Sequence, residues 1–174
     1  WGTADAVGDA IDTTLARLRE HRPEIRDRLD SLERAVRRRL AACSGVIEAR
    51  RRAGRVRQCH GDLHLANIVH HEGRFVAFDS IEFSDTLRWI DVASDVAFLA
   101  MDLQARGRAD LAATFTSSWI EAANDHQAVG VLPVYMVYRA VVRAAVAAIR
   151  STQAGAGAKA DPAVAAAAAA ETDR

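Results

Sequence analysis

The sequence predicts an α+β fold that is mostly helical and contains a small β-hairpin. Apolar residues repeat with helical spacing in long segments on both sides of residues 55–83. Within that stretch, two short apolar runs, 67–71 and 74–78, are separated by Glu72-Gly73, a typical hairpin turn. Half of the 174 residues are hydrophobic, which is enough for the core of one domain or one large lobe.

Two helices are predicted in the amino-terminal part, over residues 5–22 and 23–52. Apolar residues recur there at steps of three, four or seven, so they form one stripe with Arg and Glu on the opposite face. Pro23 suits the first turn of the second helix, and Gly54 suits its end. We expect residues 1–54 to form a helical hairpin that packs on the rest of the domain, with a coiled-coil partner face as the alternative.

A short strand is predicted over residues 55–59, which would give a sheet of two or three strands together with the hairpin. Helices are predicted over 87–104, 110–125 and 132–150. The first of these is apolar nearly all round, which predicts a central, buried helix. Residues 55–150 are therefore expected to form one packed unit, the larger part of the domain.

The composition changes at residue 151. Residues 151–174 contain two glycines, a proline and a long run of alanines, with nothing large to bury. A low-complexity, disordered tail is predicted. Residues 155–159 lack the spacing of a phosphate-binding loop and follow no strand, so no such loop is assigned.

Charge and cysteine content limit the classes of function. The 23 basic and 23 acidic residues give a net charge of zero, which argues against nucleic acid as a general partner. The arginine runs at 37–39 and 50–52 are expected on solvated faces, with phosphate binding less favoured. Cys43 and Cys59 form no paired motif, which suggests the reducing cytoplasm. No signal peptide or membrane span is expected.

A cluster of polar residues between the predicted strands is the candidate site. Asp62 and Asn67 are five residues apart, and the hairpin returns Asp79 to the same sheet edge. Phosphoryl transfer from a nucleotide needs a base for the acceptor hydroxyl and magnesium to hold the phosphates. Asp62 would accept the proton, and Asn67 and Asp79 would supply the oxygen ligands that Mg²⁺ prefers.

Alternative interpretations remain open for these residues. The three oxygen-bearing side chains could instead form turn hydrogen bonds only. His60 is expected to hold the loop by hydrogen bonds rather than to carry a proton. With His64, Asp62 and Asp79 it could also form the zinc or iron site of a hydrolase, although a consistent third nitrogen ligand is lacking.

Three charged residues follow the cluster at helical spacing. Arg88, Asp91 and Asp95 are separated by three and four residues, so they would share one face of the predicted helix. From that face they could brace the catalytic loop.

The cluster resembles a known family. Residues 60–68, HGDLHLANI, are similar to the HGDLHxxN catalytic loop of aminoglycoside phosphotransferase-like proteins, which belong to the kinase-like superfamily. The resemblance continues in FDSIEF (78–83), in 87–103 and in 138–140, and it covers about 35–149. The longer pattern is similar to a bacterial subgroup in which this domain is fused to a P-loop ATPase domain.

The resemblance implies the carboxy-terminal lobe of a protein-kinase-like fold, with residues 55–150 as its catalytic core. It implies transfer of the ATP γ-phosphate to a small-molecule hydroxyl, with Asp62 as catalytic base and Asn67 and Asp79 as Mg²⁺ ligands. Residues expected to support the loop and the following helix are His60, His64, Glu82, Arg88, Asp91 and Asp95.

The sequence also departs from the family. The nucleotide-gripping lysine and glycine-rich strands belong to an amino-terminal lobe, but no lysine precedes Lys159 here. The chain, which begins with Trp1, is therefore expected to be a fragment that needs this lobe, and a carboxy-terminal ATPase domain, as partners. Alone it should bind nucleotide poorly. A non-catalytic regulatory or interaction module accompanying an ATPase domain is the alternative, and the family does not identify the acceptor.

Overall fold

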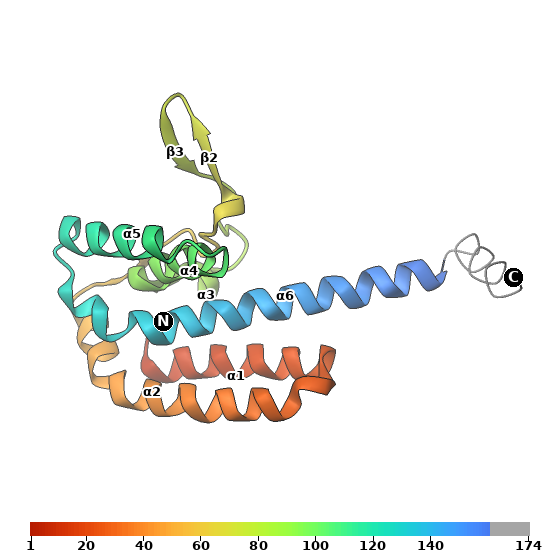
Figure 1. The fold of residues 1–174 in the computed structure, drawn as a ribbon. Coiled ribbons are helices and arrows are strands. Elements are labelled where there is room, and N and C mark those ends of the chain that lie inside the picture. Colours follow the sequence, from red (N-terminus) through yellow and green to blue (C-terminus); the bar gives the residue numbers. More distant parts are fainter. Residues whose placement is uncertain (161–174) are drawn as a thin grey trace, which may run out of the picture.

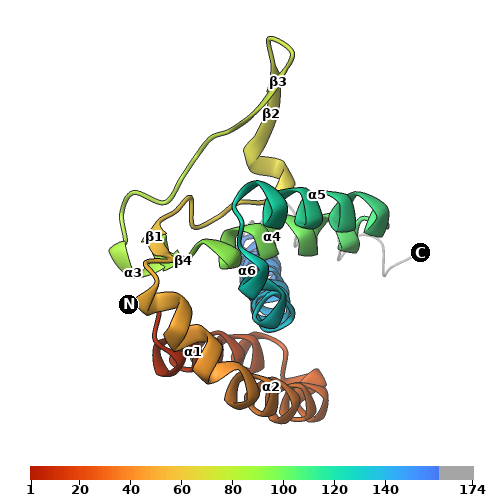
Figure 2. The same ribbon diagram turned by 90° about the vertical axis from the view of Figure 1, so that its left-hand side faces the viewer.

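The computed structural model describes residues 1–160 as three stacked layers of helices (Figure 1). Helices α1 (Ala4–His21) and α2 (Arg26–Arg52) form the first layer. Helix α6 (Leu132–Ala160) lies on them, and α4 (Val92–Ala105) and α5 (Ala109–Ala122) lie on the other side of α6. Figure 2 shows the same order of layers from the side, with a β-hairpin projecting beyond the last one. The mostly helical α+β architecture is as predicted.

The two amino-terminal helices bury the predicted apolar stripe. Thr3 caps α1 by accepting a hydrogen bond from the N–H of Ala6 at 3.1 Å, and Pro23 begins the short 3-10 turn Pro23–Ile25 between the helices. The stripe packs against α6 within the chain, so its apolar surface is covered internally. Its buried members are Ile11, Leu15, Leu18, Leu29, Val36, Cys43 and Ile47.

The strands form two separate antiparallel pairs rather than one sheet. Strand β1 (Val56–Gln58) pairs with β4 (Trp89–Asp91), and β2 (Ile68–His71) pairs with β3 (Arg74–Ala77). Glu72 and Gly73 have φ angles of 47° and 75°, as the two central residues of the predicted tight hairpin turn require.

The helix predicted over residues 87–104 was wrong at its start. A short helix, α3 (Asp85–Arg88), and strand β4 come first, and α4 begins at Val92. Short apolar runs fit a strand as well as a helix, so periodicity alone cannot separate them. Pairing of β4 with β1 decides the conformation in the folded chain.

The last helix is longer than predicted and lies at the centre of the core. It continues past Arg150 to Ala160, so the first ten residues of the predicted disordered tail are helical, while residues 161–174 lie outside the described part. By length and composition, Leu132–Gln153 could cross a membrane, but a buried core helix passes the same test. The helix buries Val134, Tyr135 and Val141 in the core shared with α1 and α2, and the absence of a membrane span stays a prediction.

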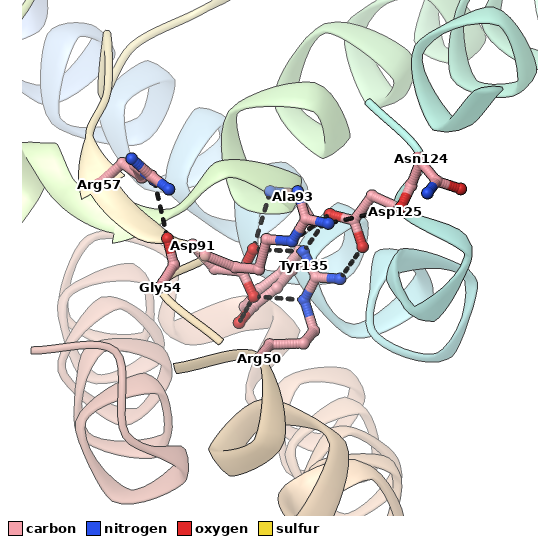
Figure 3. A network of polar contacts seen from close by, with 9 residues as sticks. Arg50, Gly54, Arg57, Asp91, Ala93, Asn124, Asp125 and Tyr135 are labelled. Atoms are coloured by element: carbon pink, nitrogen blue, oxygen red, sulfur yellow. Dashed lines mark hydrogen bonds and ion pairs between the residues drawn. The ribbon is translucent and has the colours of Figure 1, made fainter. Parts of the chain in front are cut away.

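A fully buried arginine joins the layers (Figure 3). Arg50 donates from Nε and Nη2 to the two carboxylate oxygens of Asp91, both at 2.8 Å. Its Nη1 and Nη2 donate to Asp125 at 2.5 and 2.9 Å. The Tyr135 hydroxyl lies 3.4 Å from the same Asp91. The expectation that residues 50–52 are all solvated is therefore wrong for Arg50, because two carboxylates distant in sequence converge on it.

The ion pairs shift the pKa values of Arg50 and of Asp125. Burial alone would lower the pKa of Arg50, but its hydrogen bonds to Asp91 and Asp125 outweigh burial and raise it. Burial likewise would raise the pKa of Asp125, but hydrogen bonding to Arg50 brings it below the ordinary 3.8. Arg50 and Asp125 are therefore both charged at neutral pH in the folded chain.

Replacing Arg50 should destabilise the fold strongly. In Arg50→Met, two buried carboxylates lose their partner, so the free energy of unfolding should fall by about 3–5 kcal/mol. Arg51→Met is the matched control, because Arg51 is the neighbouring residue but is 43% exposed and pairs with Glu48 at the surface. It should change the free energy by less than about 0.5 kcal/mol in chemical denaturation. Equal losses in the two variants would contradict the role of Arg50.

Acid should weaken the same junction. Because the pKa of Asp125 is lower in the folded chain than the ordinary 3.8, its stabilisation is present above that pH and is lost as the pH falls through the folded value. Asp125→Asn should therefore flatten the decline of the unfolding free energy below about pH 4. The measurement is denaturant unfolding at a series of pH values, with exposed Asp27→Asn as the control. An unchanged acid slope in Asp125→Asn would refute the assignment.

Candidate functional site

The loop between β1 and β2 is fixed at its start by α4. The backbone N–H of His60 donates to Asp95 Oδ2 at 2.7 Å, and that of Gly61 donates to Oδ1 at 3.0 Å. Burial is the main influence on Asp95 and raises its pKa, although Arg139 and the two N–H groups act in the opposite direction. Asp95 therefore braces the loop, as its sequence position suggested.

A glycine is required at residue 61. Gly61 has a φ angle of 84°, which side-chain-bearing residues rarely adopt. A Cβ atom there would also lie 2.9 Å from the carbonyl oxygen of Leu87 and 3.1 Å from Cδ1 of Ile81. The loop therefore packs closely on the segment that leads into β4.

The structure brings Asp62 and Asn67 into direct contact. Asn67 Nδ2 donates to the backbone oxygen of Asp62 at 3.0 Å and to its Oδ2 at 3.2 Å. This end of the loop is also held by α4, because the N–H of Leu65 donates to Asp102 Oδ2 at 3.0 Å. Asn67 is 8% exposed, whereas the Asp62 side chain is 40% exposed to solvent.

The hairpin returns the chain to this loop at Asp79. The N–H of Phe78 donates to the Asn67 carbonyl at 3.0 Å, and the Phe78 carbonyl lies 2.8 Å from His60 Nε2. Asp79 itself has a φ angle of 61°, uncommon for a residue with a side chain. It lines the same open hollow as Asp62, together with Ser80, Ile81, Glu82 and Phe83.

His64 adds a buried ring beside Asp62. Its Nε2 lies 3.3 Å from Asp62 Oδ2, and its ring meets Phe98 edge-on at a centroid distance of 5.5 Å. Its Nδ1 is buried with no hydrogen-bond partner in the part of the chain that the structure describes. Within that part, no group of three or more His, Cys, Asp or Glu side chains could hold a metal ion. The zinc or iron hydrolase alternative therefore has no support there.

Arg88 and Asp91 were also expected to brace the loop, but their side chains lie elsewhere. Arg88 pairs with Asp85 at 2.8 Å at the surface, and only its backbone carbonyl reaches the loop, through the N–H of Cys59. Asp91 binds Arg50 and caps α4 through the N–H of Ala93. The expectation that both share a helix face with Asp95 was wrong, because strand β4 interrupts the helix between them.

Sequence reasoning gave no role to two residues that hold the loop. Asp102 caps its far end, and Arg139 donates from Nη1 to the Gly61 carbonyl at 3.0 Å. Charged residues inside two strongly apolar helical segments were the available signal, because buried charges must be paired or hydrogen-bonded.

Comparison with known proteins assigns the chain to a family. The model of the phosphotransferase enzyme family matches residues 3–131, so the chain belongs to that family. The uncharacterized proteins Mb2027c of Mycobacterium bovis, and MT2060 and Rv2004c of Mycobacterium tuberculosis, are each 33% identical to it over 154 residues. These matches cover 87% of this chain but 31% of each relative. No solved structure matches the chain significantly.

The close approach at Gly61 can be tested separately from its backbone strain. Gly61→Ala should lower the free energy of unfolding by at least about 1 kcal/mol more than Gly107→Ala, because overpacking adds to the strain. Gly107 is the matched control, since its φ angle is 76° but a Cβ there would meet no atom within 4 Å. Denaturant unfolding gives both values. Equal losses would show that the contact with Leu87 relaxes without cost.

Proposed function

We propose that this chain forms the lobe of a kinase-like phosphotransferase that carries the catalytic loop, and that the enzyme transfers the ATP γ-phosphate to the hydroxyl of a small molecule. One observation carries the proposal. Asp62 and Asn67 touch within a loop that is braced at both ends, and Asp79 lines the same hollow as Asp62. This is the set of groups that a base and a magnesium clamp require.

Separate roles follow from the contacts of these residues. Asp62, which is partly exposed, would accept the proton of the acceptor hydroxyl. Asn67 directs Nδ2 to Asp62, which leaves Oδ1 for a cation, and Asp79 adds a carboxylate. One or two carboxylates, completed by phosphates and water, are the usual protein ligands of Mg²⁺. Bound Mg²⁺ would offset negative charge on the phosphates.

The enzyme would need polypeptide beyond this chain. The hairpin and the following loop expose large apolar side chains, with Phe75 82% and Phe83 85% exposed, and Phe78 also partly uncovered. Such surfaces commonly mark interaction sites. We propose that an amino-terminal lobe covers them and supplies the nucleotide-binding groups, and that a P-loop ATPase domain follows. The chain spans 31% of the length of its relatives, which leaves room for both.

The same exposed side chains favour a second candidate, a non-catalytic interaction module. In that case the hairpin would dock on a neighbouring domain, and the loop would keep its shape without turnover. Both candidates are proposed to act in the cytoplasm, without nucleic acid or membrane as partner.

Activity of an Asp62 variant separates the candidates. The measurement is Mg²⁺-dependent ATP turnover with a panel of small alcohols, in the longest natural reading frame that contains this chain. Asp62→Asn should lower kcat by about 10²–10⁴-fold, because it removes the base. Asp85→Asn is the control, since Asp85 pairs with Arg88 outside the hollow. Equal turnover in wild type and Asp62→Asn would exclude the assigned base, and a wild type without turnover would favour the interaction module.

A further inference from the structure

We infer that Arg139 of α6 is a positioning residue that sets the direction of the Gly61 carbonyl and thereby the place of Asp62. Arg139 donates from Nη1 to that carbonyl at 3.0 Å and from Nε to Ser94 Oγ at 3.2 Å. It is 4% exposed, so water does not compete for these bonds. The catalytic consequence rests on the proposed function, whereas the effect on the loop can be measured without it.

The two backbone polar groups of Gly61 are held by residues of two different helices, α4 and α6. Asp95 accepts the N–H, and Arg139 donates to the C=O. Because a peptide unit is planar, a fixed Gly61 carbonyl also fixes the N–H of Asp62, which points to His60 Nδ1 at 3.3 Å. The peptide unit immediately before the proposed base is therefore held at both its carbonyl and its N–H.

Aromatic rings hold the guanidinium itself in place. Its central carbon lies 4.9 Å from the centroid of the Phe98 ring and 5.3 Å from that of Tyr138. A planar cation over the face of an aromatic ring is favoured electrostatically and loses little freedom on forming its hydrogen bonds. Phe98 also contacts His64, whose Nε2 is next to the Asp62 carboxylate. One ring thus supports both the backbone and the side-chain surroundings of Asp62.

Arg139 does more than neutralise a buried carboxylate. Its Nη2 is 4.0 Å from Asp95 Oδ1, too far for a hydrogen bond, and its short contacts are to a hydroxyl and a backbone carbonyl. By contrast, every short contact of Arg50 is to a carboxylate. Arg139 therefore binds the backbone of the loop rather than a carboxylate. A lysine at residue 139 would keep the positive charge. It has no planar guanidinium, so it could not hold the hydrogen bonds to Ser94 and to the Gly61 carbonyl in one fixed plane.

Arg139→Lys therefore tests the inference in a variant that retains the buried charge. Backbone amide hydrogen exchange at residues 60–62 should accelerate about tenfold, because the loop loses a charge-assisted hydrogen bond. In the longest natural reading frame, kcat should fall about 10²-fold, with the KM for ATP changed less than about threefold, because the base is misplaced while nucleotide binding is kept. Arg143→Lys, one turn further along α6, is the control: Arg143 lines a neighbouring hollow that Asp102 also lines, but within the described residues it forms no hydrogen bond or ion pair with the loop or its braces.

The outcomes distinguish this inference from the proposed function. Faster exchange with a selective loss of kcat supports the positioning role. Exchange at residues 60–62 that matches the Arg143→Lys control overturns it, whatever the activity. A wild-type protein without turnover, combined with faster exchange in Arg139→Lys, refutes the phosphotransferase proposal and supports the hold of Arg139 on the loop. A loss of kcat as large in Arg143→Lys as in Arg139→Lys overturns the catalytic part of the inference.

Discussion

The buried junction of Arg50 with Asp91 and Asp125 is the constraint on which the rest of the structure depends. It joins α2, the start of α4 and the segment after α5 through one guanidinium that water does not reach. Burying three charges costs several kcal/mol each, so the arrangement persists only because all the short contacts are made at once. Asp91 also caps α4, so the same junction determines where that helix begins.

Helix α4 connects the Arg50 junction to the loop of the candidate site. Asp95 and Asp102 are seven residues apart, which places them on one face about 10 Å from each other along the helix. Asp95 holds the loop at residues 60–61, and Asp102 holds it at Leu65. The two ends of the loop are thus attached to one rigid element. Asp62 lies between these attachments and Asn67 lies two residues after the second, which explains how a solvent-open loop can keep a defined geometry.

Much of this organisation could be predicted from the sequence, and the exceptions have physical reasons. Glu72-Gly73 defines the hairpin locally, because few residue pairs adopt its two positive φ angles. Helical periodicity located α1 and α2 because it depends on neighbours a few residues away. Strand β4 was missed because three residues carry too little pattern and its partner lies about thirty residues earlier. Arg50 was placed in a solvated run because its two partners are 41 and 75 residues away.

By itself, the sequence determined the mostly helical class, the hairpin and the spacing of Asp62, Asn67 and Asp79, because these depend on local conformation and on residue type. The tertiary structure alone decided which charged residues serve the loop. Among three acids in one segment, Asp91 joins the layers while Asp95 and Asp102 hold the loop. Of two buried arginines, one binds carboxylates and the other binds a carbonyl. Side chains of the same type acquire different roles because long-range packing chooses their partners, and burial makes each choice energetically decisive.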